Sequence, residues 1–230
     1  MQPKLKINRQ MLFPLILTAV SAALITVSGI IFKQEIYRII PLYISLFVGV
    51  LQMKANRFSY LLGGLNCLIY TAVFASLGLY ATAASLILFS APLQIITFWR
   101  WNKRSYKQST TFKSLGVRGW LLISTIFAVS FFTVNFLLDS VDSSYPVMDN
   151  LSTLIGIAAS VLGLLCYREY SFVMILSGAI SFSLYVLLAI DDPAQITYVV
   201  YSTNSMICIV CQFFAVQALY REQRLRKKAE

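Results

Sequence analysis

The chain has 230 residues, of which 58% are hydrophobic and only 12% are charged. Soluble domains carry roughly 25% charged residues, so this composition excludes an ordinary soluble domain and predicts an integral membrane protein. Lys and Arg total 19 against 9 Asp and Glu, and histidine is absent, which excludes a His-ligated metal site and a Ser-His-Asp triad.

Uncharged stretches between the charged residues predict the membrane spans in chain order. A transmembrane helix needs about 17–25 mostly apolar residues, because an ionised side chain at mid-depth is costly. The stretches are 10–32, 39–53, 58–99, 119–138, 150–167, 170–190 and 193–220. The stretch 58–99 is too long for one helix and contains the turn sequence Gly78-Leu79-Tyr80, so we expect two helices there. The chain is therefore predicted to be all-α, with eight transmembrane helices.

The distribution of charge predicts the orientation of these spans. An even number of spans puts both termini on one side, and Lys and Arg favour the cytoplasm. With the N-terminus inside, all Lys and Arg except Lys33 and Arg38 lie in cytoplasmic segments, whereas most acids, Asp142 and Asp149 among them, lie outside. We therefore expect an N-in and C-in topology, and we interpret the net charge of +10 mainly as a consequence of it.

The interior of the predicted spans is neutral, with no Asp, Glu, Lys or Arg away from the span ends. Intramembrane ionisable groups are the usual carriers of proton or ion coupling, so ion-driven transport lacks its usual residues. No general acid/base pair is visible either, so an enzyme is not expected. The remaining amides and phenols either bind a polar ligand or join helices by hydrogen bonds. No metal or cofactor is predicted, and Cys208 and Cys211 on one apolar helix are interpreted as packing residues.

The spans divide into two sets of three around a single helix. Spans 39–53, 58–77 and 80–99 precede the single span 119–138, and spans 151–167, 171–190 and 195–219 follow it. This 3+1+3 order gives a parallel repeat about an axis along the membrane normal. The expected organisation is an N-terminal tail and extra transmembrane helix (1–38), a first three-helix bundle (39–101), a basic cytoplasmic loop and linker helix (102–138), a second three-helix bundle (139–220) and a basic cytoplasmic tail (221–230).

Two short motifs are the most specific features of the chain. They are Tyr70-xxx-Phe74-xxx-Gly78-Leu79-Tyr80, and a span ending Pro92-Leu-Gln94-Ile-Ile-Thr-Phe98-Trp99-x-Trp101 before a basic loop. With Asn204 in the last span, they resemble the PnuC family of bacterial vitamin transporters, best known for nicotinamide riboside. The resemblance extends from about residue 39 to the C-terminus and implies a SWEET-like fold in the bacterial inner membrane. It also implies facilitated diffusion of an uncharged or weakly charged vitamin precursor, which cytoplasmic phosphorylation then traps.

The resemblance implies that particular residues contact the substrate. Gln94 and Asn204 are expected as amide contacts, and Phe98 or Trp99 as a stacking or gating ring. Asn66 and Tyr70 are four residues apart on one helical face and are expected to line the same cavity. The candidate site residues are Gln94, Phe98, Trp99, Asn204, Asn66, Tyr70 and Tyr185.

One motif of the family, Trp-xx-Trp-xxx-Asn on the seventh span, is absent. Its positions hold Ser171, Met174 and Gly178, which cannot stack or hydrogen-bond as the family residues do. Phe172 and Tyr185 are the candidates for replacing part of the stacking surface. The substrate therefore stays open among nicotinamide riboside, thiamine, riboflavin and deoxynucleosides.

We expect a uniporter for nicotinamide riboside or a related nucleoside or vitamin. Its expected partners are that small molecule and the lipid bilayer, without nucleic acid, and a homo-oligomer is left open. The alternative is a non-transporting membrane scaffold, or a substrate-binding subunit that docks a separate partner through the basic loop.

Overall fold

The structure is a computed structural model that describes residues 9–139 and 145–229. Of the charged residues assigned to a side of the membrane above, Lys4, Lys6, Asp142 and Glu230 lie outside the described residues.

The described residues form helices and one short hairpin. In chain order they are α1 (Arg9–Ile31), α2 (Ile36–Gln52), α3 (Phe58–Ser76), α4 (Tyr80–Ser85), the π turn η1 (Leu86–Ser90), α5 (Ala91–Lys103), β1 (Ser105–Tyr106), β2 (Ser109–Thr110), α6 (Val117–Asp139), α7 (Pro146–Leu164), α8 (Tyr170–Asp191), the 3₁₀ turn η2 (Pro193–Gln195) and α9 (Ile196–Ala229). The predicted helical class is therefore confirmed, with a two-stranded antiparallel hairpin added.

Length and hydropathy identify the segments that can cross a membrane. Within the described residues there are seven, namely Leu12–Ile31, Phe58–Ser76, Tyr80–Lys103, Val117–Leu137, Pro146–Leu164, Tyr170–Asp191 and Pro193–Arg226. The helix α2 is also apolar, but with 17 residues it is shorter than these. The chain is thus a multi-pass membrane protein.

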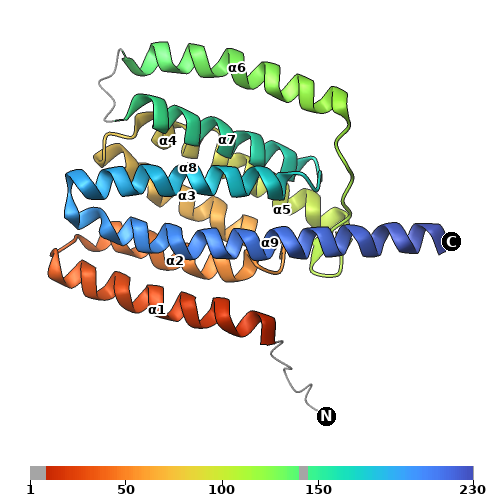
Figure 1. The fold of residues 1–230 in the computed structure, drawn as a ribbon, viewed down its shortest axis with the longest axis horizontal. Helices are drawn as coiled ribbons and strands as arrows, with labels where there is room; N and C mark the ends of the chain where they lie inside the picture. The colour runs from red at the N-terminus through yellow and green to blue at the C-terminus, as the bar shows by residue number, and fades with distance from the viewer. Residues whose placement is uncertain (1–8, 140–144, 230) are drawn as a thin grey trace.

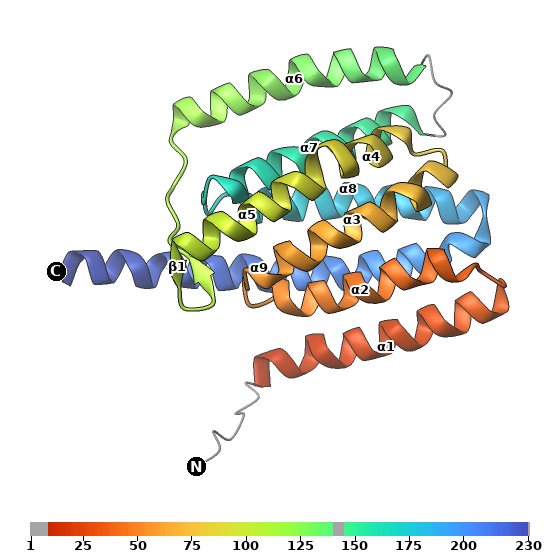
Figure 2. The ribbon, with the colours of Figure 1, turned by 180° about the vertical axis from the view of Figure 1, so that it is seen from behind.

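The helices lie side by side with their axes roughly along one direction (Figures 1 and 2). The helix α9 packs against α8, α2 and α1, and α7 packs against α8, α5 and α4. At one edge of the molecule, α6 packs against α7 (Figure 1). No side chain of Val117–Leu137 is buried, and an apolar helix with this exposure fits a position facing lipid.

The segment Tyr80–Lys103 is interrupted at η1, two residues before Pro92. Proline has no backbone N–H, so the carbonyl of Leu88 loses its regular helical donor, and π turns occur where helical hydrogen bonding is disturbed. The turn before α4 lies where the sequence predicts it, with Gly78 at a φ of 70°, a conformation that glycine adopts without steric cost.

The helix α7 begins earlier than the sequence suggested. The predicted span started at residue 151, but α7 starts at Pro146, because the fixed φ of proline suits the first helical position. Asp149 consequently lies in the first turn of a helix and is fully buried, rather than at a loop edge open to water.

The carboxylate of Asp149 caps the N-terminus of α4. Its Oδ2 accepts a hydrogen bond from the Ala81 N–H at 2.9 Å, and its Oδ1 accepts from the Thr82 N–H at 3.0 Å and the Thr82 hydroxyl at 2.5 Å. The first N–H groups of a helix have no partner inside the helix, and a carboxylate there also complements the helix dipole. This contact joins α4 and α7 at one end of the molecule.

At the opposite end, Trp101 connects α5 with α7. Its indole N–H donates to the carbonyl of Gly163 at 2.9 Å, and the ring is fully buried. The rings of Tyr60 and Tyr170 lie 4.7 and 5.9 Å from the Trp101 ring, between centroids. The chain is thus packed tightly at both ends, in two separate apolar clusters.

Replacing Asp149 by Asn is expected to lower the free energy of unfolding by about 1–3 kcal/mol. The substitution replaces one of the two carboxylate oxygens that accept hydrogen bonds from α4 with an NH2 group, which can only donate. Glu35→Gln is the matched control, since Glu35 precedes α2 but makes no side-chain capping hydrogen bond. Thermal unfolding in detergent should show a lower Tm for Asp149→Asn only. Equal Tm values for the two variants would contradict the capping role.

Candidate ligand-binding cavity

A cavity of about 230 Å³ lies among α2, α3, α5, α8 and α9, with η1 at its wall. Its lining is mixed polar, aromatic and aliphatic. The residues are Ser45, Val48, Gln52, Gly63, Asn66, Cys67, Tyr70, Phe74, Leu86, Gln94, Met174, Tyr185, Tyr201, Ser205 and Ile209. Four of the seven candidate residues from the sequence, Asn66, Tyr70, Gln94 and Tyr185, therefore meet in one place.

Asn66, which lines this cavity, has an acceptor without a partner among the described residues. Its Nδ2 donates to the Pro41 carbonyl at 2.9 Å and to the Ser45 hydroxyl at 2.8 Å. Its Oδ1 is buried and accepts no hydrogen bond from any residue that the structure describes. Because Ser45 in turn donates to the Tyr70 hydroxyl at 3.1 Å, the amide is held in a fixed orientation. A ligand donor would satisfy the buried oxygen, whose desolvation otherwise costs about 1–3 kcal/mol.

Gln94 reaches the cavity because α3 has glycines opposite it. A Cβ at Gly63 would lie 2.3 Å from the Gln94 Oε1, and a Cβ at Gly64 would lie 3.3 Å from the Ala91 carbonyl oxygen. The amide Nε2 donates to the Cys67 sulfur at 3.3 Å, which is a weak acceptor. A ligand can therefore compete for this amide at little cost.

An aromatic stack closes one side of the cavity. The rings of Tyr70 and Phe74 are stacked at 5.2 Å between centroids, and those of Phe74 and Tyr185 are stacked at 6.3 Å. Tyr198 continues the group at 5.7 Å from Tyr185. All four rings are buried and lie at the separations favoured by aromatic pairs.

A second cavity, of about 170 Å³, lies on the other side of this stack, with walls from α4, α7 and α8. Phe74, Leu86 and Tyr185 line both cavities. Hydroxyl groups of Ser and Thr dominate the rest of the second lining, which includes Thr82, Ser85, Ser152, Thr153, Ser177 and Ser181. The two polar cavities thus share three apolar or aromatic side chains in their walls.

The other three candidate residues do not line the central cavity. Phe98 packs on Phe58 with ring centroids 5.5 Å apart, and the Trp99 side chain is 60% exposed on the outer surface. Asn204 is buried, but its Oδ1 accepts from the Thr18 hydroxyl at 3.1 Å, so it faces α1. The part of these residues in ligand binding stays a prediction.

The positions of the absent motif on α8 have different surroundings. Met174 lines the cavity, as the motif position implies, but with a thioether instead of an indole. Ser171 donates to the Arg168 carbonyl at 2.8 Å, and Gly178 makes room for the sulfur of Met206. Phe172 is 57% exposed and is not among the residues that line the cavity, so of the two substitutes considered only Tyr185 reaches it.

Sequence reasoning missed several polar residues of the lining. Ser45, Tyr201 and Ser205 contribute hydroxyls, and Cys67 contributes a thiol. Helical periodicity could have indicated Ser45, because the helix that carries it has a pronounced apolar face, but hydroxyls are frequent in every span.

The lining of the central cavity is electrically neutral. No Asp, Glu, Lys or Arg is among its lining residues. Within the described part of the chain there is also no group of three or more Cys, Asp or Glu that could hold a metal ion. The cavity therefore suits a ligand recognised by amides, hydroxyls and ring faces.

Comparison with known proteins identifies relatives along most of the chain. A family model described as nicotinamide mononucleotide transporter matches residues 35–213. The nicotinamide riboside transporter PnuC of Neisseria mucosa is 27% identical over 171 residues, which cover 70% of this chain. The match spans 64% of the length of that relative, less than two thirds of it.

The fold is also similar to a solved structure. A crystal structure of the vitamin B3 transporter PnuC superimposes with a TM-score of 0.73 at 22% sequence identity. The match covers 92% of this chain and 93% of that one, so the likeness includes nearly the whole helical arrangement.

Proposed function

This chain belongs to the nicotinamide mononucleotide transporter family, and we propose that it carries nicotinamide riboside, or a closely related nucleoside or vitamin, across the bacterial inner membrane. The proposed mechanism is facilitated diffusion, with the product trapped by cytoplasmic phosphorylation. Membership of a transporter family does not favour the alternative of a non-transporting scaffold.

One observation carries this proposal, namely the composition of the central cavity. Three amides, several hydroxyls and a stack of aromatic rings line it, and no side chain with a formal charge is among the described lining residues. Amides and hydroxyls complement the ribose hydroxyls and the carboxamide of nicotinamide riboside. We propose Asn66 and Gln94 as the amide contacts, with Tyr70 and Tyr185 as ring contacts.

The aromatic stack suits the nicotinamide ring in particular. The pyridinium of nicotinamide riboside carries a delocalised positive charge, which the faces of aromatic rings attract by about 2 kcal/mol when water is excluded. A carboxylate would bind such a cation more tightly and slow its release. A cavity of rings without acids therefore favours passage over retention.

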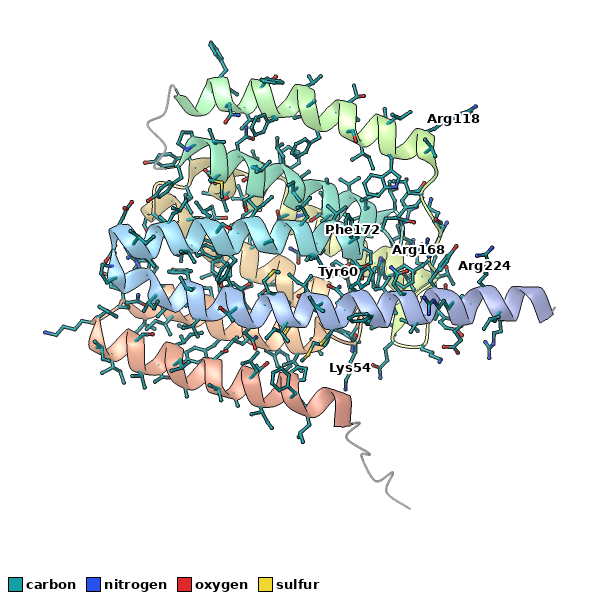
Figure 3. All side chains as sticks on the ribbon, in the orientation of Figure 1. Lys54, Tyr60, Arg118, Arg168, Phe172 and Arg224 are labelled. Carbon is teal, nitrogen blue, oxygen red and sulfur yellow. The ribbon has the colours of Figure 1, made fainter. Side chains whose placement is uncertain are left out.

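We further propose eight membrane spans, with α2 as the short one, and both termini in the cytoplasm. The helices α2–α5 and α7–α9 would be the two three-helix bundles of a 3+1+3 repeat, α6 the linker and α1 the extra helix. In Figure 3, Lys54, Arg118, Arg168 and Arg224 lie toward the end of the molecule from which α9 extends. Positive residues favour the cytoplasmic side, which supports this orientation.

The two cavities suggest how the ligand would pass. The central cavity would hold it while Phe74, Leu86 and Tyr185 separate it from the second cavity. The π turn containing Leu86 lies at this barrier, and its irregular hydrogen bonding makes it a candidate hinge. Rotation of one bundle against the other would then move the barrier.

Uptake of labelled nicotinamide riboside into proteoliposomes tests the function. Because the riboside is a cation, uptake is expected to follow its electrochemical difference. With the membrane potential clamped near zero, uptake is expected to be independent of a proton or sodium gradient. A requirement for either gradient would overturn uniport. Absence of uptake for the riboside, thiamine, riboflavin and deoxynucleosides would overturn the substrate class.

Gln94→Ala is expected to weaken binding of nicotinamide riboside about tenfold, because it removes one hydrogen bond of roughly 1.4 kcal/mol. Gly63→Ala should act in the same direction, since the new methyl group displaces the Gln94 Oε1. Titration calorimetry on the purified protein measures both. The matched controls are Gln217→Ala, an amide outside the cavity, and Gly116→Ala, where a Cβ meets nothing within 4 Å. Unchanged affinity in the first pair would contradict the assigned contact.

Phe74→Ala is expected to connect the two cavities and to admit solutes that wild type excludes, such as a purine nucleoside. Proteoliposome uptake measures this loss of selectivity. A buried Phe→Ala change also costs about 3–5 kcal/mol of stability. Leu86→Ala is therefore the second variant, because Leu86 lines both cavities but is less buried than Phe74. Phe132→Ala, on the exposed surface of α6, is the control. Unaltered selectivity in both barrier variants would exclude the barrier role.

A further inference from the structure

A separate pocket lies where α9 extends past the other helices. Its volume is about 460 Å³, and its walls come from the segment after α5 and from the end of α9. The lining residues are Tyr106, Thr111, Phe112, Lys113, Ser114, Tyr220, Gln223, Arg224 and Arg226. None of these residues lines the central cavity.

The length of α9 places this pocket beyond the hydrocarbon. A helix of 34 residues is about 51 Å long, whereas the hydrocarbon core of a bilayer is about 30 Å thick. Figures 1 and 2 show the end of α9 projecting past the hairpin β1–β2. The pocket is therefore accessible to water-soluble molecules and to lipid headgroups.

The charge of the pocket is positive and is not balanced. Lys113, Arg224 and Arg226 line it, and none of the acidic residues that the structure describes does. Among the described residues, none of these three cations forms an ion pair with a carboxylate. Aromatic rings lie under two of them, since the Lys113 Nζ is 4.2 Å from the Tyr167 ring centre and the Arg226 guanidinium carbon is 5.9 Å from that of Tyr106.

The nearest acids are occupied by other partners. Glu222 accepts from the Lys107 ammonium at 2.8 Å and from the Tyr106 hydroxyl at 3.0 Å. Glu169 accepts from the Arg168 guanidinium at 3.1 Å and from the Ser114 hydroxyl at 2.8 Å. These carboxylates bind cations beside the pocket. The three lining cations therefore remain available to a ligand.

The walls of the pocket are held in place before any ligand binds. Gln223 is buried, and its Oε1 accepts from the Phe112 N–H at 2.9 Å, while its Nε2 donates to the Thr110 carbonyl at 2.9 Å. The Lys113 N–H donates to the Cys166 carbonyl at 2.9 Å, which fixes the same loop to the turn between α7 and α8. A preformed site loses less entropy when it binds.

We propose that this pocket binds a phosphate group carried by a nucleotide or by a lipid headgroup. Two guanidinium groups and an ammonium match the charge and the several oxygens of a phosphate. The rings of Tyr106, Phe112 and Tyr220 offer apolar surface for the rest of the ligand. The volume lies within the range of about 300–1,000 Å³ that is usual for small-molecule sites. This site is independent of the proposed transport function.

Two probes distinguish the source of the phosphate. Titration calorimetry in a neutral detergent measures binding of adenosine monophosphate, and native mass spectrometry measures retained phosphatidylglycerol. Binding of the nucleotide assigns the pocket to a soluble phosphate, and retention of the lipid alone assigns it to a headgroup. Either affinity is expected to fall as salt rises, because ions screen the exposed charges. If neither probe binds, the proposal is overturned.

The double variant Lys113→Gln/Arg224→Gln is expected to weaken the bound probe at least about tenfold, because it removes two charged contacts. The matched control is Lys54→Gln/Arg118→Gln, which removes the same charge from the same end of the molecule but outside the pocket (Figure 3). The affinity of this control variant for the probe should stay within about twofold of wild type. An equal loss of affinity in both double variants would mean that only the overall charge matters, and it would overturn the proposed site.

Discussion

Hydrocarbon offers no hydrogen-bond partner, so each polar group of this chain within the bilayer must be satisfied by the protein or by a bound molecule. The carboxylate of Asp149 is satisfied by the N–H groups at the start of α4, and the indole of Trp101 by the Gly163 carbonyl. The Asn66 Oδ1 has no such partner. The same constraint thus stabilises the helix packing in two places, and in a third it leaves an unsatisfied acceptor on a residue that lines the central cavity.

These three places are arranged along the molecule. The Asp149 cap joins α4 and α7 at one end, and the Trp101 cluster joins α5 and α7 at the other. The central cavity lies among α2, α3, α5, α8 and α9 and has weaker polar contacts, such as the Gln94 amide on a sulfur. A site between two well-packed ends keeps its shape, while its polar groups remain available to a ligand.

Charge is confined to the ends of the helices for the same reason. Of the described side chains, none with a formal charge lines the central cavity, whereas three cations and no acid line the pocket at the end of α9. Beyond the hydrocarbon, water and mobile ions lower the cost of such unbalanced charge. One chain therefore provides two chemically distinct surfaces, one lined by amides, hydroxyls and rings and one lined by three cations.

The sequence by itself determined the helical class and the approximate spans, because these depend on composition and on local spacing. It also placed Asn66, Tyr70, Gln94 and Tyr185 in a common cavity, Gln94 through a resemblance to a known family and the other three through helical spacing or residue type. Local spacing does not report which face of a helix meets which neighbour. Asn204 was therefore expected in the same cavity, although the packing of α1 turns it toward Thr18.

Only the tertiary structure decided the partners of Asp149, since its donors lie 67 and 68 residues away in the chain. It also decided the role of Gly63, which matters through the approach of Gln94 and not through its own conformation. The pocket at the end of α9 likewise depends on a loop and a helix that are distant in sequence. Each of these features depends on contacts between distant segments, which composition and periodicity do not encode in a readable way.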